Sequence, residues 1–172
     1  MSAHLTHDEL KNLIRSVFSL RPEDKNLAIL VGVPDEAIPD NEAWKQRRQL
    51  AAEWQRKLSA VKIKLGLEQA DVIYYPNVHS NNTDLPATGY FYPGDPSQID
   101  ASTLSTLAEA FEFESKLAQY QILLAPTEFS TTAPLKLLAK KYGFRAATMP
   151  GFSSDMIPAL KLDYEEINRR VA

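Results

Sequence analysis

The chain has 172 residues, 44% hydrophobic and 24% charged, a composition typical of one ordinary globular domain. It contains no cysteine, which excludes disulfide and thiolate chemistry and favours a cytoplasmic location. The net charge of −3 argues against a nucleic-acid partner. The sequence shows no signal peptide and no apolar run long enough for a membrane span, so we expect no membrane association.

The first predicted element is a helix that begins after Thr6. Thr6-His7-Asp8-Glu9 has the spacing of a capping box, in which the threonine and glutamate side chains bind opposite backbone amides of the first turn. Apolar residues then recur at helical spacing up to Phe18. The nearly continuous apolar run over 26–33 predicts a strand buried on both faces of a sheet.

A long second helix is predicted from about Asn41 to Gly66. Its apolar seam contains a single charged residue, Arg47, among Trp44, Ala51, Trp54, Leu58, Val61 and Leu65. Residues 41–65 also hold seven lysines and arginines, which we interpret as a solvated helix face, with partner docking as the alternative.

Three further short apolar runs predict strands at 70–75, 120–125 and 144–149, and periodic patterns predict helices over about 102–118 and 132–142. The stretch 76–100 is predicted to be a long irregular loop, with a short hairpin or edge strand around Gly89–Tyr92. Because strands and helices alternate, we expect an α/β fold of three layers, Rossmann-like or flavodoxin-like, with a mostly parallel sheet.

Ligands of such sheets bind at the carboxyl ends of the strands, so a catalytic or binding site is expected there. The six glycines are scattered and form no phosphate-binding loop, and Gly151-Phe152-Ser153 lacks the second glycine of a serine hydrolase elbow. The three histidines, His4, His7 and His79, do not have the spacing of metal ligands. The sequence therefore predicts neither a catalytic residue nor a metal ligand nor a cofactor within this chain.

Two loops contain weak candidates for a binding site. Asn77, His79 and Asn81 follow the second predicted strand, close in sequence to several tyrosines, but an ordinary turn is the favoured interpretation. Thr127, Ser130 and Thr132 follow the third strand, where a helix begins. Their hydroxyls could help bind an anion at the helix start, although capping of the helix is favoured.

The last residues predict another helix. Asp163-Tyr164-Glu165-Glu166 has capping-box spacing, and Ile167 and Val171 start an apolar face just before the sequence ends. We therefore expect an α/β domain over residues 1–150, and a connector with the first helix of a further domain over residues 151–172.

Several segments resemble one protein family. Ser130-Thr131-Thr132-Ala133-Pro134, then Phe144 through Phe152 (FRAATMPGF), and then Asp163-Tyr164-Glu165-Glu166 through Val171 are similar to the N-terminal region of the leucyl aminopeptidase family, also known as aminopeptidase T or thermophilic metalloproteases. The similarity is clearest over residues 120–172. Thr131 stands where a histidine commonly follows the serine of the family motif.

The resemblance implies a parent enzyme with an α/β domain followed by a catalytic domain. That parent would be a dimeric aminopeptidase acting on peptide substrates with a divalent metal, zinc or cobalt, whose ligands lie beyond residue 172. No site residue can be transferred to this chain. We therefore expect a non-catalytic N-terminal domain that is inactive alone. The alternatives are a stand-alone module that binds a small molecule or a protein through the loop 76–100, and the front domain of a related ring-opening dioxygenase.

Overall fold

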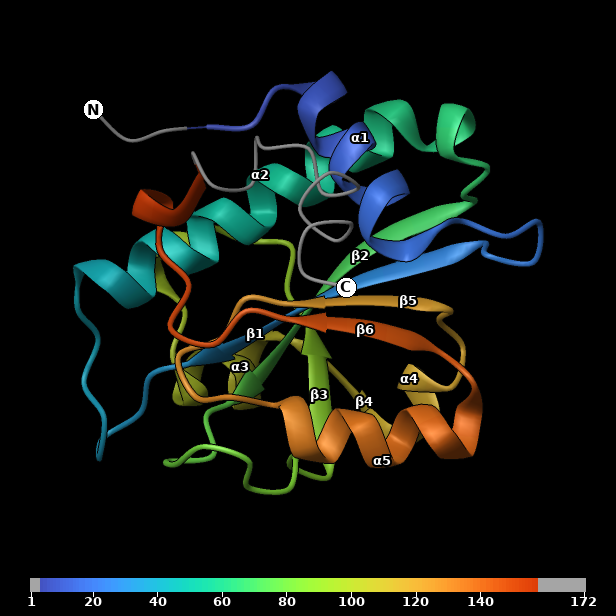
Figure 1. Cartoon of the computed structure of the whole chain (residues 1–172). Coiled ribbons are helices and arrows are strands. Elements are labelled where there is room, and N and C mark those ends of the chain that lie inside the picture. Colours follow the sequence, from blue (N-terminus) through green and yellow to red (C-terminus); the bar gives the residue numbers. More distant parts are fainter. Residues whose placement is uncertain (1–3, 158–172) are drawn as a thin grey trace.

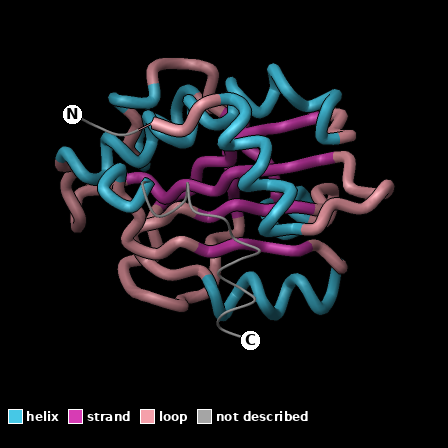
Figure 2. Tube along the Cα trace, turned by 45° about the horizontal axis from the view of Figure 1, so that its top comes forward, coloured by secondary structure: helices cyan, strands magenta, loops and turns pink. Residues whose placement is uncertain are grey.

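The computed structural model describes residues 4–157, and they form a six-stranded sheet with helices on both faces (Figures 1 and 2). The strand order is β4-β3-β2-β1-β5-β6. The four strands from β2 to β6 in this order are parallel, whereas β3 and β4 are antiparallel to their neighbours. This arrangement confirms the predicted α/β class with a mostly parallel sheet.

The helices and strands alternate along most of the chain. The helices are α1 (His7–Phe18), α2 (Glu42–Leu65), α3 (Ala101–Leu107), α4 (Phe113–Leu117) and α5 (Thr132–Tyr142), and short 3-10 helices cover Pro96–Gln98 and Ser154–Met156. The strands are β1 (Asn26–Val33), β2 (Gln69–Pro76), β3 (Thr88–Phe91), β4 (Glu109–Glu112), β5 (Ile122–Ala125) and β6 (Arg145–Thr148).

The central strand β1 separates two apolar cores. Leu27, Ile29 and Val31 point to the face covered by α1 and α2, whereas Ala28 and Leu30 point to the face covered by α4 and α5. Successive side chains of a strand project to opposite faces, so a strand buried on both sides reads as one continuous apolar run. The prediction for 26–33 is thereby confirmed.

The chain places further parallel strands on both sides of β1. The connection through α2 places β2 on one side of β1, and β5 with β6 lies on the other side. Because parallel crossovers are right-handed, α2 and α5 cover opposite faces of the sheet, as Figure 1 shows. The carboxyl ends of β1 and β5 therefore form the switch point at which such sheets bind ligands.

The helix boundaries predicted from capping signals are confirmed. Both hydrogen bonds of the capping box before α1 are present, from the Thr6 amide to Glu9 Oε1 (3.0 Å) and from the Glu9 amide to Thr6 Oγ1 (3.1 Å). Asn41 caps α2 through its side chain, and Gly66 ends the helix in the left-handed conformation at φ 75°.

The single helix predicted over 102–118 was wrong. The chain forms α3, then the edge strand β4, then the short α4. Phe111 of β4 packs against Phe91 of β3, with ring centroids 4.8 Å apart, and this cross-strand contact accompanies the pairing of the two strands. The strand predicted around Gly89–Tyr92 exists as β3, but it is an inner strand because β4 forms the edge.

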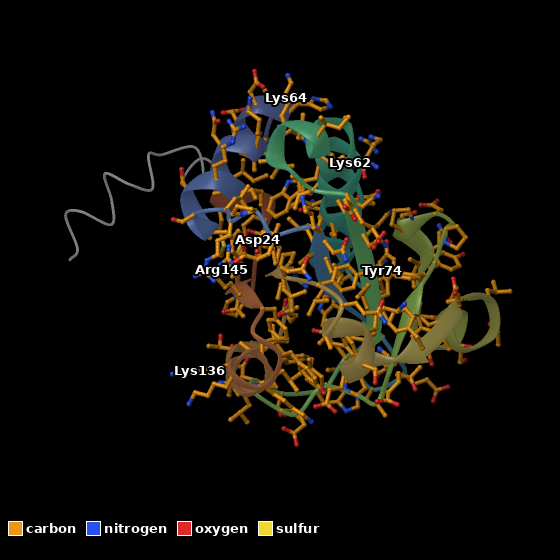
Figure 3. All side chains as sticks on the ribbon, turned by 90° about the vertical axis from the view of Figure 1, so that its right-hand side faces the viewer. Asp24, Lys62, Lys64, Tyr74, Lys136 and Arg145 are labelled. Atoms are coloured by element: carbon orange, nitrogen blue, oxygen red, sulfur yellow. The ribbon has the colours of Figure 1, made fainter. Side chains whose placement is uncertain are left out.

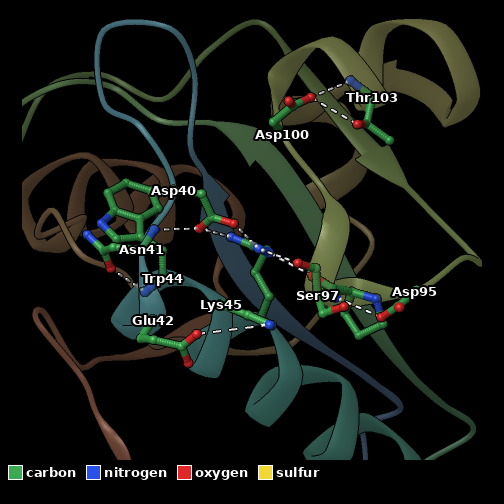
Figure 4. Close-up of polar contacts among 11 residues, drawn as sticks. Asp40, Asn41, Glu42, Trp44, Lys45, Asp95, Ser97, Asp100 and Thr103 are labelled. Carbon is green, nitrogen blue, oxygen red and sulfur yellow. Dashed lines mark hydrogen bonds and ion pairs between the residues drawn. The ribbon is translucent and has the colours of Figure 1, made fainter.

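The prediction of a solvated basic face on α2 was wrong for two of its arginines. Arg47 is 3% exposed and Arg48 is fully buried. Arg48 donates to both carboxylate oxygens of Asp40, at 3.0 and 2.8 Å, and to the carbonyl oxygens of Pro96 and Ser97 (Figure 4). This guanidinium therefore fastens the start of α2 to the turn before α3.

A second ion pair fixes the opposite edge of the sheet. Arg145 at the start of β6 donates two hydrogen bonds to the buried carboxylate of Asp24, at 3.1 and 2.7 Å, and another to the carbonyl oxygen of Phe18 (Figure 3). The pair joins β6 to the loop before β1.

None of the helices within residues 4–157 is both long and apolar enough to cross a bilayer. The helix predicted from Asp163 lies outside the described residues. Of the predicted connector over 151–172, residues 151–157 are described, and Phe152 and Ile157 are buried in the core under α2. Phe152 packs edge-on against Trp54 at 5.4 Å between ring centroids.

Candidate functional site at the carboxyl edge of the sheet

All six predicted binding residues lie at the carboxyl edge of the parallel strands. Asn77, His79 and Asn81 are in the loop after β2, and Thr127, Ser130 and Thr132 follow β5. Neighbouring parallel strands end at the same edge, so these two loops flank the loop that leaves β1. The contacts of each side chain determine whether it is free to bind a ligand.

Asn77 fastens the end of β2 to the end of β1. Its side-chain amide donates to the Val33 carbonyl oxygen at 2.9 Å, and its Oδ1 accepts from the His79 amide at 3.0 Å. The second bond closes a tight turn in which His79 has a positive φ of 67°. The turn interpretation of Asn77 therefore agrees with its contacts.

His79 reaches across to the loop after β1. Its Nε2 lies 2.6 Å from Asp35 Oδ2, and the imidazole remains about half exposed. Burial on its own would raise the pKa of Asp35, but hydrogen bonds from His79 and from the Ile38 amide outweigh it and lower the pKa below its usual value. Asp35 is thus an ionised partner of His79 at neutral pH.

Asn81 and its neighbour Asn82 join the β2 loop to the start of α5. Asn81 Oδ1 accepts from the Ser130 amide at 2.8 Å, and the Asn82 amide donates to the Ser130 carbonyl oxygen at 2.7 Å. Asn82 Oδ1 then accepts from the Ala133 amide at 3.0 Å. An asparagine from a distant loop therefore caps α5.

The remaining contacts complete this cap. Ser130 Oγ accepts from the Thr132 amide at 3.2 Å, while the N-cap residue Thr131 makes no side-chain capping bond. The third helical residue, Pro134, has no amide hydrogen. The amides that an anion would use at this helix start already have acceptors, which favours capping over anion binding.

The hydroxyl groups of Thr127 and Thr132 also form hydrogen bonds within the domain. Thr127 is 1% exposed, and its hydroxyl donates to the carbonyl oxygen of Phe129. Thr132 Oγ1 lies 2.8 Å from Thr148 Oγ1 at the end of β6. The structure thus brings Asn81, Ser130 and Thr132 together, pairs Asn77 with His79, and buries Thr127 beneath its loop.

The site prediction did not include an ion pair at the switch point between a buried arginine and a partly exposed glutamate. Arg47 of α2 donates to Glu128 Oε2 at 2.6 Å and to the Phe152 carbonyl oxygen at 3.0 Å. Its Nη1 is buried and has no hydrogen-bond partner among the described residues. Burial lowers the pKa of Arg47, and the Glu128 carboxylate opposes that shift. The signal in the sequence was Arg47 itself, the one charge on an apolar seam.

Tyr75 lies beside this pair on β2. Burial raises the pKa of its hydroxyl far above the ordinary value, although a hydrogen bond with Thr127 and the positive charge of Arg47 act in the opposite direction. Its ring packs over Gly32 of β1, where a Cβ atom would come within 3.4 Å of the ring. Tyr75 therefore remains a neutral, packed side chain at neutral pH.

Comparison with known protein families, curated proteins and solved structures gave no match. The family resemblance of residues 120–172 therefore stays a prediction.

Two of the hollows of the described surface flank the sheet. One, of about 570 Å³, is bordered by α2, β2 and the segment after β3, and its aromatic wall contains Tyr74, Phe91 and Tyr92. The other, of about 520 Å³, runs between α4 and α5 and is mostly apolar. Within residues 4–157, no three or more histidine or acidic side chains gather in a way that could hold a metal ion.

Proposed function

We propose that this chain is a non-catalytic α/β domain of a metal-dependent, aminopeptidase-like enzyme, in which it helps to shape the substrate cleft or the dimer. The observation that carries the proposal is that polar side chains at the carboxyl edge form hydrogen bonds within the domain. The polar groups at this edge form hydrogen bonds that join neighbouring loops and cap α5; these groups belong to Asn77, Asn81, Asn82 and Ser130. Such an edge serves as a scaffold rather than as a reaction centre.

The segments that resemble the aminopeptidase family have defined structural roles here. The segment 130–134 forms the start of α5, and the segment 144–152 contains β6 and the buried Phe152. The described residues offer no cluster suited to zinc or cobalt. The metal ligands of the proposed parent would lie beyond residue 172, and no reaction step is assigned to this chain.

The test compares the full reading frame that contains this sequence with the 172-residue chain. Both proteins are assayed for release of N-terminal leucine from a chromogenic anilide, with zinc or cobalt added or removed by a chelator. We expect metal-dependent hydrolysis by the longer protein alone. Hydrolysis by the 172-residue chain itself, or a reading frame that ends at Ala172, would contradict the proposal.

The same preparation distinguishes the related dioxygenase. A longer protein that binds metal but hydrolyses no anilide would be tested with a dihydroxypyridine and oxygen. Ring opening of the dihydroxypyridine would identify the longer protein as a dioxygenase instead of an aminopeptidase. The proposed scaffold role of this domain would stay the same.

A second candidate function is a stand-alone binding module, favoured by the hollow beside β2. Tyr74, Phe91 and Tyr92 provide aromatic faces, and Asp71 and Glu109 provide negative charge at its border. This combination suits a small aromatic cation. Benzamidine titrated into the chain should shift the NMR signals of Phe91 and Tyr92, and Tyr92→Ala should abolish the shifts. Unchanged signals in the native chain would exclude this site for such ligands.

A further inference from the structure

The groove between α4 and α5 exists because one face of the sheet is thinly covered. The opposite face carries α1 and α2, of 12 and 24 residues. On the groove side, α4 has only five residues, a length of about 7 Å. A hollow of about 520 Å³ remains beside this short helix, between α4 and α5.

Apolar side chains form the floor and one wall of this groove. Phe113 and Leu117 of α4 are buried at its base, and Leu85 and Leu138 are partly buried beside them. Leu137 of α5 is 65% exposed on the wall. An exposed leucine that lines a concave apolar surface marks an interaction site more strongly than one on a convex surface.

The rim of the groove is acidic. Asp84, Glu112 and Glu114 all line it. Glu114 lies 3.2 Å from Lys141 Nζ, a surface pair of little strength. Asp84 and Glu112 form no ion pair with any residue in the described part of the chain. An occupant that combines apolar side chains with positive charges would complement this surface.

We propose that the groove binds a basic amphipathic helix of a partner protein. Leucine-like side chains on one face of that helix would contact Leu137, Leu85 and Leu138, while flanking lysines or arginines would lie near Asp84 and Glu112. The acidic rim disfavours both nucleic acid and an anionic membrane. This proposal does not rest on the aminopeptidase assignment, because its observations concern another face of the molecule.

The test measures fluorescence anisotropy of a labelled helical peptide of about 15 residues, with leucines on one face and lysines elsewhere. The reference peptide has glutamate in place of every lysine. We expect the lysine peptide to bind the 172-residue chain at least about tenfold more tightly, and the difference to shrink as salt rises from about 50 to 300 mM. Equal binding of both peptides would overturn the proposal.

Two variants separate groove binding from general attraction to an acidic protein. Leu137→Glu adds a negative charge, and charge alone would strengthen binding of the lysine peptide. The variant also removes an apolar contact in the groove, so we expect binding to weaken about tenfold. The control, Leu107→Glu, alters a leucine of α3 that is 70% exposed outside the groove, and it should leave affinity unchanged or slightly higher. Equal affinity for both variants would overturn the proposal.

Glu112→Lys tests the rim, with Glu109→Lys on the same strand as its control outside the groove. Both variants change the net charge of the chain by the same amount. We therefore expect Glu112→Lys to weaken binding of the lysine peptide more than Glu109→Lys does. Sedimentation of the chain alone tests a second copy as the occupant. A dimer that both Leu137→Glu and Ile63→Glu disrupt would show that the exposed Ile63 of a second copy occupies the groove. That result would overturn the proposal of a partner helix.

Discussion

Two buried charges of this molecule, on Arg47 and Asp24, have partners far away in the sequence. Arg47 could be recognised as unusual from sequence, because it interrupts the apolar seam of α2. Its partner could not, because Glu128 lies 81 residues further on and no local pattern links the two. Asp24 and Arg145 are separated by 121 residues. Such contacts depend on the assembled fold, so sequence reasoning missed them.

The Arg47–Glu128 pair should respond unequally to removal of either partner. In Glu128→Ala, a buried guanidinium loses its counter-charge, and we expect a loss of about 3 kcal/mol in the free energy of unfolding. In Arg47→Met, the remaining Glu128 is 38% exposed and can be hydrated, so the change should stay within about 1 kcal/mol. Urea unfolding measures both values, and the reverse order would contradict this account of the pair.

The Asp24–Arg145 pair predicts a pH dependence. Burial opposes ionisation of Asp24, but the hydrogen bond and charge of Arg145, with the amide of Arg21, lower its pKa below the usual value. A lowered pKa in the folded state stabilises the fold above the unfolded pKa of about 3.9, and this contribution is lost as the pH falls through the folded pKa.

The corresponding variant is Asp24→Asn. At pH 7 it should cost about 2 to 3 kcal/mol of unfolding free energy, less than a fully buried pair because Arg145 keeps 24% exposure. Below pH 3 the difference from the native chain should shrink. Asp8→Asn alters a carboxylate that is 76% exposed and pairs with Lys11; it serves as the control and should change stability by less than about 0.5 kcal/mol. A cost independent of pH would argue against the ion pair as its source.

At the scale of elements, patterns with local causes were predictable. The continuous run of β1 and the caps of α1 and α2 follow from neighbouring residues. The start of α5 was also predicted, but its capping oxygen comes from Asn82, some 50 residues earlier, rather than from Thr131. The break of the predicted helix over 102–118 depends on pairing of β4 with β3, which no local pattern specifies by itself.

Asn82→Ala tests the long-range cap. Loss of the acceptor for the Ala133 amide should cost about 1 kcal/mol of unfolding free energy and speed hydrogen exchange of that amide. Thr83→Ala alters the next residue, whose exposed hydroxyl contacts Ser80 instead of α5, and should leave the exchange unchanged. Unaltered Ala133 exchange in Asn82→Ala would contradict the cap.

Gly89→Ala tests the packing of β3 against β4 and α4. An added Cβ would come within 2.9 Å of Phe111 Cε2 and 3.2 Å of Phe113 Cδ1. We expect this crowding to cost about 1 to 3 kcal/mol. In Gly32→Ala the nearest atom is 3.4 Å away, so the cost measured by urea unfolding should be smaller. Equal costs would show that the phenylalanines move aside easily.

At the scale of the whole molecule, the sheet has one heavily covered face and one thinly covered face. The α/β class followed from the alternation of strands and helices, whereas the groove beside α4 was hidden by the wrong helix prediction. At the carboxyl edge, sequence reasoning singled out two loops, but it could not show that their polar groups hydrogen-bond to other loops and to the start of α5. Those hydrogen bonds depend on which acceptor faces which amide after folding.

The central claim is that this domain is a scaffold without a metal centre of its own. The direct measurement is the zinc content of the 172-residue chain and of the full reading frame, each loaded with zinc and then dialysed against metal-free buffer. We predict that the longer protein retains about one or more zinc ions per chain and that the 172-residue chain retains almost none. Stoichiometric zinc on the 172-residue chain, or none on either protein, would contradict the claim.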